Sequence, residues 1–154
     1  MIDPIIRIAR QSDYPQVSAI MQQVHALHVA WRPDVYRPCD PALPEDAFLD
    51  EVANESMVVA EVDGRVAGIL SFLRRKVGSE RQVPRNVLFI DVMAVDESLR
   101  GQGIGRALFD YIRRYAASEH FDGVELQVNA RNTAAYHMYK HYGFTEKSIN
   151  LELL

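Results

Sequence analysis

The sequence predicts a layered α/β domain in which helices flank a mixed β-sheet. Three observations support this fold class. Apolar runs at 5–9 and 87–95 have the length and composition of strands. Residues 103–118 place apolar side chains at helical spacing. Two further apolar runs are separated by Asp63-Gly64, a pair that favours a tight hairpin turn.

The composition is that of one ordinary globular domain spanning residues 1–154. Apolar residues make up 48% of the chain and charged residues 25%, which is sufficient for a single core. The net charge of −4 disfavours bulk binding to nucleic acid. With one cysteine, no apolar run of membrane-spanning length and no signal-peptide pattern, we expect a cytoplasmic protein without nucleic-acid or membrane partners.

The first third of the chain predicts one strand and two helices. The strand at 5–9 leads into a helix that Ser12 or Asp13 would cap. Pro33 ends this helix, because proline cannot continue it. After a proline-rich loop, a second and shorter helix is expected at 45–54.

The rest of the chain predicts the centre of the sheet and two more helices. A hairpin of strands at 57–62 and 65–75 precedes a polar loop at 78–85. The remaining elements, in order, are a strand at 87–95, a helix at 103–118, a strand at 124–129, a helix at 132–142 and a closing strand at 144–153. The expected order is therefore β-α-α-β-β-β-α-β-α-β.

A glycine-rich turn between the strand at 87–95 and the following helix is the clearest candidate binding site. Glycines at 101, 103 and 105 allow the backbone to approach a ligand closely. The start of the helix offers unpaired N–H groups and the positive end of its dipole. Arg100 and Arg106 add positive charge. The turn therefore predicts a phosphate or pyrophosphate site.

Two common nucleotide-binding patterns do not fit this turn. A Walker loop requires Gly-Lys-Ser/Thr, whereas Gly105 is followed by Arg106. The third glycine of a dinucleotide fingerprint would fall at Arg106 or Leu108. A glycine-rich connection that binds nothing remains the alternative on these residues alone.

Two segments resemble the GNAT superfamily of N-acetyltransferases. The pattern Arg100-x-x-Gly103-x-Gly105 resembles the acyl-CoA signature of that family. Residues 132–144, NTAAYHMYKHYGF, resemble its Asn-x-x-Ala-x-x-x-Tyr…Gly-Phe segment, and the opening IRIARQSD is similar to its Arg-x-Ala-x-x-x-Asp. The resemblance covers almost the whole chain, in the family's order.

This resemblance implies a GNAT-like fold with acetyl-CoA as cosubstrate. The turn would wrap the pyrophosphate, and the strand before it would hold the pantetheine, with the N–H of Met93 as an oxyanion donor. The implied cosubstrate contacts are Met93, Ala94, Val95, Arg100, Gly101, Gln102, Gly103, Ile104, Gly105, Arg106, Asn132 and Tyr139. No metal is expected, because His25 and His28 lack a third ligand.

The resemblance also implies catalytic roles. Tyr139 stands where the family often places a general acid, and a phenol with a pKa of roughly 10 can protonate a departing thiolate whose pKa is roughly 8–9. A purely packed core tyrosine is the alternative. The position of the carboxylate in histone-acetylating members is Phe89 here. Asp91 is the nearest carboxylate, on the same strand face as Phe89 and Met93, and is the candidate base; a structural aspartate, Glu125 or a water relay remain alternatives.

The acceptor side is implied to lie against the first long helix and the loop that follows it. The candidate substrate contacts are His28, Trp31, Tyr36, Asp91 and Asn129. The expected reaction is direct transfer of an acetyl group, in a ternary complex, to a small-molecule or peptide primary amine. A non-catalytic acyl-CoA-binding or sensing domain is the alternative, and a homodimer through sheet edges or the C-terminal strand is an open arrangement.

Overall fold

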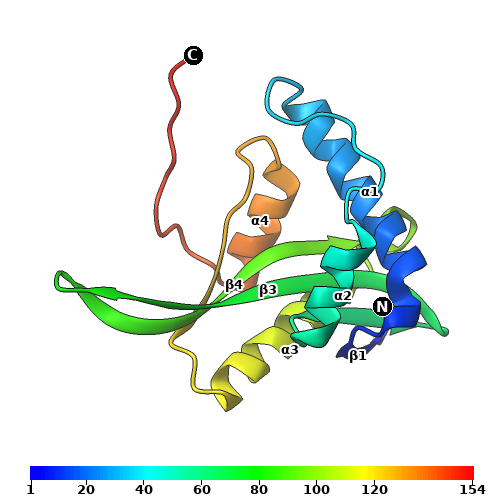
Figure 1. Cartoon of the computed structure of the whole chain (residues 1–154), viewed down its shortest axis with the longest axis horizontal. Helices are drawn as coiled ribbons and strands as arrows, with labels where there is room; N and C mark the ends of the chain where they lie inside the picture. The colour runs from blue at the N-terminus through cyan, green and yellow to red at the C-terminus, as the bar shows by residue number, and fades with distance from the viewer.

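The computed structural model describes all 154 residues and confirms the mixed α/β fold (Figure 1). One five-stranded sheet has the order β1-β2-β3-β4-β5. All neighbouring strands are antiparallel except β4 and β5, which are parallel. The elements, in chain order, are β1 (Ile5–Ile8), a 3-10 turn (Gln11–Asp13), α1 (Tyr14–Trp31), α2 (Glu45–Ala53), β2 (Met57–Val62), β3 (Arg65–Ser79), β4 (Gln82–Val95), a 3-10 turn (Glu97–Leu99), α3 (Ile104–Ser118), β5 (Gly123–Leu126) and α4 (Thr133–Tyr142).

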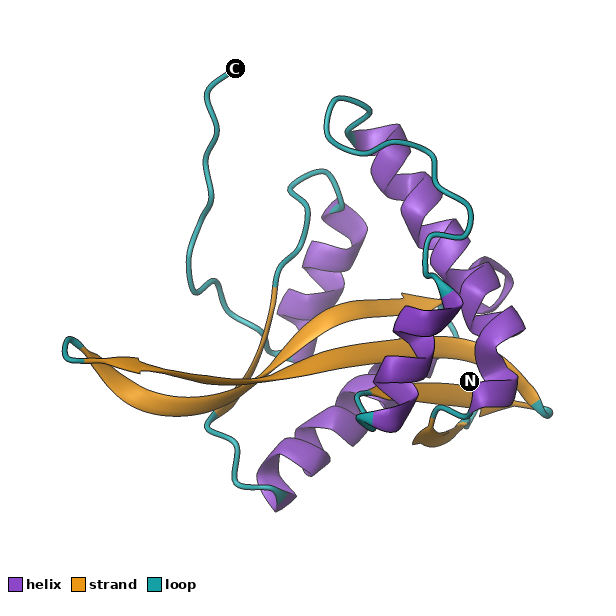
Figure 2. Ribbon diagram, in the orientation of Figure 1, coloured by secondary structure: helices purple, strands orange, loops and turns teal.

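Helices cover both faces of the sheet and enclose two apolar cores (Figure 2). On one face, α1 and α2 bury side chains that include Val17, Ile20 and Phe48. On the other face, α3 buries an apolar stripe that includes Leu108 and Ile112. No helix is both long enough and apolar enough to span a bilayer.

The opening segment has a clear structural role. The Arg7 guanidinium forms ion pairs with Asp13, at 2.8 Å, and with Glu61 on β2, at 2.7 Å. Asp13 also accepts a hydrogen bond from the backbone N–H of Arg10. Burial alone would raise the pKa of Asp13, but the bonds from Arg7 and Arg10 outweigh it and the pKa is lowered. This network fixes β1, β2 and the start of α1 to one another.

A close approach between sheet and helix fixes the start of α3. A Cβ atom added to Gly68 on β3 would lie only 3.1 Å from Cγ2 of Ile104 and 3.2 Å from the carbonyl oxygen of Ala94. A larger residue at position 68 would require Ile104 or the backbone at Ala94 to shift, so glycine suits this close approach of β3 and the first turn of α3. The glycine-rich turn before α3 is therefore held against the sheet.

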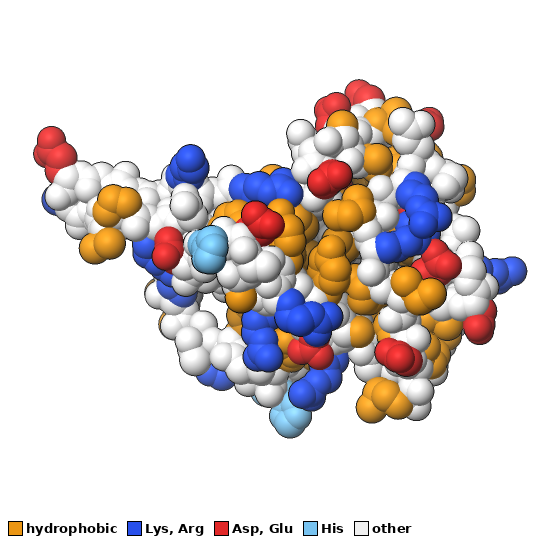
Figure 3. Space-filling view, turned by 90° about the horizontal axis from the view of Figure 1, so that it is seen from below, with side chains coloured by type: hydrophobic (Ala, Val, Ile, Leu, Met, Phe, Trp, Pro, Cys, Tyr) orange, Lys and Arg blue, Asp and Glu red, His pale blue; other side chains and the backbone are white.

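Residues 78–85 form a hairpin rather than the predicted polar loop. β3 and β4 stay paired out to Ser79↔Gln82, so that only a tight turn separates them. Polar side chains suit these strands because the hairpin projects from the rest of the molecule (Figure 3), and its residues 73–84 are exposed. The composition indicated exposure correctly, and the interpretation as a loop was wrong.

The predicted closing strand at 144–153 is absent, and β5 ends at Leu126 rather than at 129. After α4 the chain runs as an isolated extended segment away from the body (Figure 1). A strand requires a neighbour for its backbone groups. No backbone–backbone hydrogen bond involves residues 145–154, so this segment has no neighbouring strand.

Candidate functional site

The centre of the candidate site is the second half of β4, where this strand separates from β5. β4 pairs with β5 only over residues 87–90. Its pairing with β3 continues to Val95. Residues 91–95 therefore have one paired edge and one open edge.

The open edge presents the backbone groups of Met93 and Val95. The N–H of Asp96 donates to the carbonyl of Ala67 on the β3 side, at 2.8 Å. Because backbone groups alternate in direction along a strand, those of Met93 and Val95 point away from β3. Arg100 reaches the Val95 carbonyl through Nε, at 3.1 Å, while Met93 keeps a free N–H.

A β-bulge at Asp91 changes which way the strand's side chains face. Ser71 of β3 pairs with Val92 and Phe72 with Ile90, so Asp91 is an extra residue without a partner. Its side chain is exposed. The expectation that Asp91 shares a face with Met93 was wrong: Met93 packs on the α3 core, whereas the charge of Asp91 acts on Glu51 of α2.

The glycine-rich turn has the geometry that an anion site requires. Gly101 and Gly103 have φ of 77° and 90°, in the left-handed region that favours glycine. A Cβ on Gly101 would meet no atom within 4 Å, so the turn is open there. Gln102 is held from behind, because its carbonyl accepts from the N–H of Ile2 at 3.0 Å. The turn can therefore accommodate a phosphate group.

The first turn of α3 lies directly beside the open edge of β4. A Cβ on Gly105 would lie 3.7 Å from Cε of Met93 and 3.9 Å from Cγ2 of Val95. The unpaired N–H groups at the start of α3 point out of this turn, and Arg100 and Arg106 are exposed next to it. Buried Ile104 anchors the turn in the core, and Ala94 between the two open residues is likewise buried.

Tyr139 of α4 packs on the same side of the sheet. Its ring contacts Phe109 and Phe144, with centroids 5.6 Å and 5.8 Å away. The hydroxyl has no hydrogen-bond partner in the chain. Burial raises the pKa of Tyr139, so the phenol keeps its proton near neutral pH and can donate it.

A large hollow of about 1570 Å³ adjoins Tyr139 and separates β5 from the extended C-terminal segment. Phe89 lines it and is covered by the guanidinium of Arg75, 3.8 Å from the ring centroid. Arg32 at the end of α1 lines it as well. Glu125 on β5 forms ion pairs with Lys147 and Arg85, which makes it a poor candidate for a free base.

Glu51 on α2 is a candidate functional residue that the sequence interpretation missed. Oε2 of its carboxylate is buried and has no hydrogen-bond partner. Burial raises the pKa of Glu51 to about 7, and the negative charge of Asp91 adds to the shift. The available signal was its spacing, because Glu51 lies three residues after Phe48 and one before Val52, on the inward face.

The predicted acceptor residues of α1 and its loop do come together. The rings of Trp31 and Tyr36 lie 5.5 Å and 5.1 Å from that of His28. Nδ1 of His28 is buried without a partner. Burial, with a smaller contribution from His25, lowers the pKa of His28 and keeps its ring neutral. These side chains form a compact aromatic cluster at the end of α1.

The two predicted asparagines have structural bonds. Asn132 caps α4, because its Oδ1 accepts from the N–H of Ala135 at 3.2 Å. Asn129 lies in the loop after β5, where its Oδ1 accepts from the N–H of Arg131 at 2.9 Å. In both residues the side-chain NH₂ group makes no bond within the chain.

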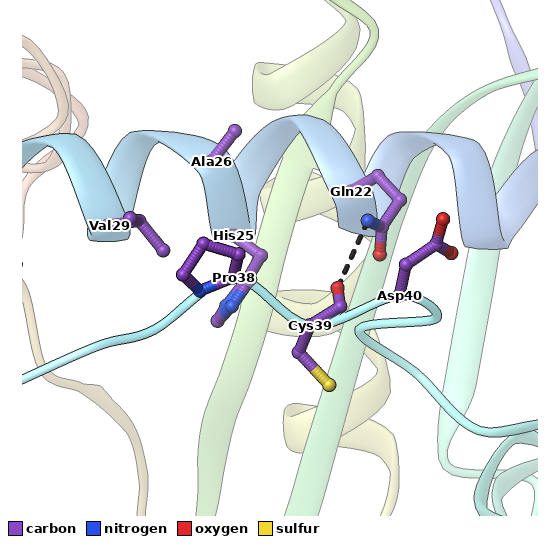
Figure 4. Close-up of a pocket in the computed structure, with 7 residues that line it drawn as sticks. All are labelled: Gln22, His25, Ala26, Val29, Pro38, Cys39 and Asp40. Atoms are coloured by element: carbon purple, nitrogen blue, oxygen red, sulfur yellow. Dashed lines mark hydrogen bonds between the residues drawn. The ribbon is translucent and has the colours of Figure 1, made fainter.

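A second, smaller cavity of about 410 Å³ lies between α1 and the proline-rich loop (Figure 4). The amide of Gln22 donates to the carbonyl of Cys39 at 3.1 Å and so holds the loop on α1. None of the residues lining this cavity lines the larger hollow. No group of three or more His, Cys, Asp or Glu side chains is placed to bind a metal ion.

Known proteins match this chain in sequence and in fold. The model of the acetyltransferase (GNAT) family matches residues 21–144. An uncharacterised N-acetyltransferase of Methanocaldococcus jannaschii is 33% identical over 95 residues, which are 62% of this chain but only 41% of that protein. A crystal structure of a mutant Bacillus halodurans protein is 29% identical and superimposes with a TM-score of 0.90 over 97% of this chain and 98% of that one. An aminoglycoside N-acetyltransferase in complex with CoA shares the fold, with a TM-score of 0.73 at 18% identity over 99% of this chain and 94% of that one.

The shifted pKa of Glu51 predicts a pH-dependent effect on stability. Its folded-state pKa of about 7 exceeds the ordinary value of 4.5, so Glu51 destabilises the fold increasingly as pH rises between these values, and fully above 7. The side chain is half exposed, so screening by water reduces the penalty to about 1 kcal/mol. Glu51→Gln should therefore raise the melting temperature by about 2–4 °C more at about pH 8 than at about pH 4.

Thermal unfolding followed by circular dichroism measures this difference. Asp50→Asn is the matched control, because Asp50 is the exposed neighbour on the same helix. An equal gain from Glu51→Gln at both pH values would contradict the raised pKa.

Proposed function

Because this chain belongs to the GNAT acetyltransferase family, we propose that it transfers the acetyl group of acetyl-CoA directly to a primary amine bound in the same complex. The observation that supports the proposal best is the open edge of β4 at residues 91–95, which leads into a left-handed glycine turn and a helix N-terminus. Free backbone groups on a strand edge can form hydrogen bonds with the amide groups of the extended pantetheine arm of acetyl-CoA. The turn suits the pyrophosphate at its end.

In this proposal the chain's own groups position the thioester. The free N–H of Met93 polarises the acetyl oxygen. Because the sheet already fixes the direction of this N–H, the donor does not have to reorient during the reaction. Arg100 and Arg106 balance the phosphate charge at the turn. The resemblance to a solved aminoglycoside N-acetyltransferase with CoA supports this placement at the level of the fold.

Tyr139 is the proposed general acid. The amine nitrogen forms a bond to the acetyl carbon, the C–S bond breaks, and the thiolate takes the phenol proton. Two properties suit Tyr139 to this step: its position beside the α3 core and its unpaired hydroxyl. Its raised pKa keeps the phenol protonated before the reaction. Protons lost from the amine return the phenol to its neutral form through solvent.

The acceptor approaches β4 from the α2 side in this proposal. Asp91 and Glu51 supply negative charge there, which attracts a protonated amine, and either carboxylate can accept its proton. The cluster of His28, Trp31 and Tyr36 offers aromatic faces to the rest of a small-molecule or peptide acceptor. Asn129 can donate its free NH₂ group to the acceptor from the loop after β5.

The cosubstrate site is tested at Gly101, where an added side chain meets no protein atom. Gly101→Asp places a negative charge beside the pyrophosphate and should weaken acetyl-CoA binding by about tenfold or more, measured by calorimetry. Gly101→Asn has the same shape without the charge, and both residues tolerate a positive φ. Equal affinities for the two variants would exclude the turn as the phosphate site. Gly103 is less suitable, because a Cβ added there would collide with Sδ of Met1.

The acid role is tested by Tyr139→Phe. The change removes an unpaired hydroxyl and keeps the ring contacts with Phe109 and Phe144. We expect kcat to fall by about a hundredfold, with the melting temperature and the Kd for acetyl-CoA unchanged. Tyr142→Phe is the control, since the Tyr142 hydroxyl is committed to Asp110. Full kcat in Tyr139→Phe across the pH range would rule out Tyr139 as the acid.

The base is tested by the pH dependence of kcat/KM for the amine. A required Glu51 carboxylate gives a profile that rises with pH and changes slope near pH 7. Glu51→Gln should remove this break, and Asp91→Asn should move it to lower pH, because the charge that helps to raise the Glu51 pKa is lost. A break that persists in Glu51→Gln assigns the base elsewhere.

A further inference from the structure

Arg75 on β3 carries a positive charge that no acidic side chain of the chain neutralises. Its guanidinium forms no ion pair and no hydrogen bond within the chain. The neighbouring Arg74 is different, because its guanidinium donates to the carbonyls of Asn54 and Glu55 and to the hydroxyl of Tyr115. The N–H donors of Arg75 are therefore available to a ligand.

Stacking on Phe89 holds the Arg75 guanidinium in place. Arg75 is paired with Val87 of β4, and its side chain leans along the sheet until Cζ lies 3.8 Å from the centroid of the Phe89 ring. This contact uses the flat face of the guanidinium and leaves the N–H groups in its plane free to donate. A group that is already ordered loses less conformational freedom when a ligand binds.

The stacked pair lies on the acceptor side of the sheet. Leu88 and Ile90 pack on the α3 core, so Phe89 between them faces the opposite side, toward α1 and α2. Asp91 follows two residues later, and its charge acts on α2 of that same side. At about 3.3 Å per residue of strand, the Arg75 guanidinium over Phe89 lies roughly 7 Å along β4 from Asp91.

The two ends of this face have opposite charge. Glu125 of β5 is paired with Phe89, and its carboxylate is shared by Lys147 at 2.8 Å and Arg85 at 3.4 Å. With Arg75 added, the positive charges around Phe89 outnumber the negative one. At the other end, the carboxylates of β4 and α2 act on each other without a cation as partner. A ligand that fits this face carries a cation at one end and an anion at the other.

We propose that Arg75 binds an anionic group of the acceptor, a carboxylate or a phosphate, and so selects amines that carry this group about 7–10 Å from the nitrogen. The fork of N–H groups on a guanidinium matches two oxygens of either anion. The inference rests on the proposed function, in which the protonated amine reaches β4 beside Asp91 and Glu51. Arg75 then determines specificity and orients the acceptor, and the acetyl-transfer step itself is unchanged.

Calorimetry on the full chain in the presence of CoA tests the anion site. The probes are 6-aminohexanoate, 5-aminopentyl phosphate and the uncharged 6-aminohexanamide. We expect an anionic probe to bind about tenfold more tightly than the amide, or better, and the tighter of the two anionic probes identifies the anion. Arg75→Met keeps an unbranched stem over Phe89, and should lose this preference without a change in the Kd for the amide.

Lys76→Met is the matched control for this measurement. It removes the same charge from the next exposed position of β3, whose side chain points to the other face of the hairpin. The preference for the anionic probe should therefore persist in Lys76→Met. Equal Kd values for charged and uncharged probes in the wild-type protein, or a preference that survives in Arg75→Met, would overturn the proposal.

Steady-state kinetics separates this inference from the proposed function. Arg75→Met should raise the KM for the anionic amine by about tenfold with kcat unchanged, because Arg75 contributes to binding and not to the chemical step. Acetylation of charged and uncharged probes with equal kcat/KM would reject the role of Arg75 and leave the acetyltransferase activity intact. If no probe is acetylated, but Arg75→Met removes a tenfold binding preference, the anion site stands and acetyl transfer to these amines does not.

Discussion

The arrangement of the site depends on the pairing of β4. This strand stays hydrogen-bonded to β3 along its whole length, whereas its pairing with β5 ends at residue 90. The bulge at Asp91 occurs at the point where pairing with β5 ends. It turns Asp91 out of the core, and on the other edge the N–H of Met93 is free while the carbonyl of Val95 accepts only from Arg100. Because β5 ends at Leu126, the remainder of β4 has no neighbour on that edge, and its backbone groups there are left for a ligand. The separation of two strands is thus what turns a buried sheet into a binding surface.

The electrostatics of the acceptor side follow from the same bulge. An aspartate inside a regular β4 would lie within an apolar core, where an unpaired charge is very costly. The extra residue places Asp91 at the surface, opposite α2, where its charge acts on the half-buried carboxylate of Glu51. Burial and, to a smaller extent, the charge of Asp91 raise the pKa of Glu51 to about 7, so Glu51 holds its proton up to near neutral pH. This is the proton affinity expected of a group that exchanges protons with an amine.

Periodicity was sufficient for most of the fold because most elements have one buried face. The stripe of α3, the Asp63-Gly64 turn and the glycines before α3 were all predicted from local pattern. The bulge was not, since it depends on the register of Ser71 against Val92 on another strand. Glu51 was missed for a related reason: its pKa depends first on its burial against the sheet and then on the charge of Asp91, 40 residues away in sequence, and no local pattern reports either. The proximity of Gly105 to Met93 and Val95 could be predicted, because the strand, the turn and the helix that carry them follow one another in the sequence.

The C-terminal segment shows how a sequence pattern can be right about a preference and wrong about a partner. Alternating apolar residues at 149, 151 and 153 indicate a strand with one buried face, and the chain is extended there. Ion pairs tie this segment to Glu125 on β5 through Lys147 and to Arg32 through Glu152, but no backbone hydrogen bond joins it to β5. Pattern alone specifies that a face must be buried and not which molecule buries it. The segment thus satisfies the strand pattern and lies beside an open edge, yet it has no backbone hydrogen bonds, because the pattern records a preference of the residues and not the position of a neighbouring strand.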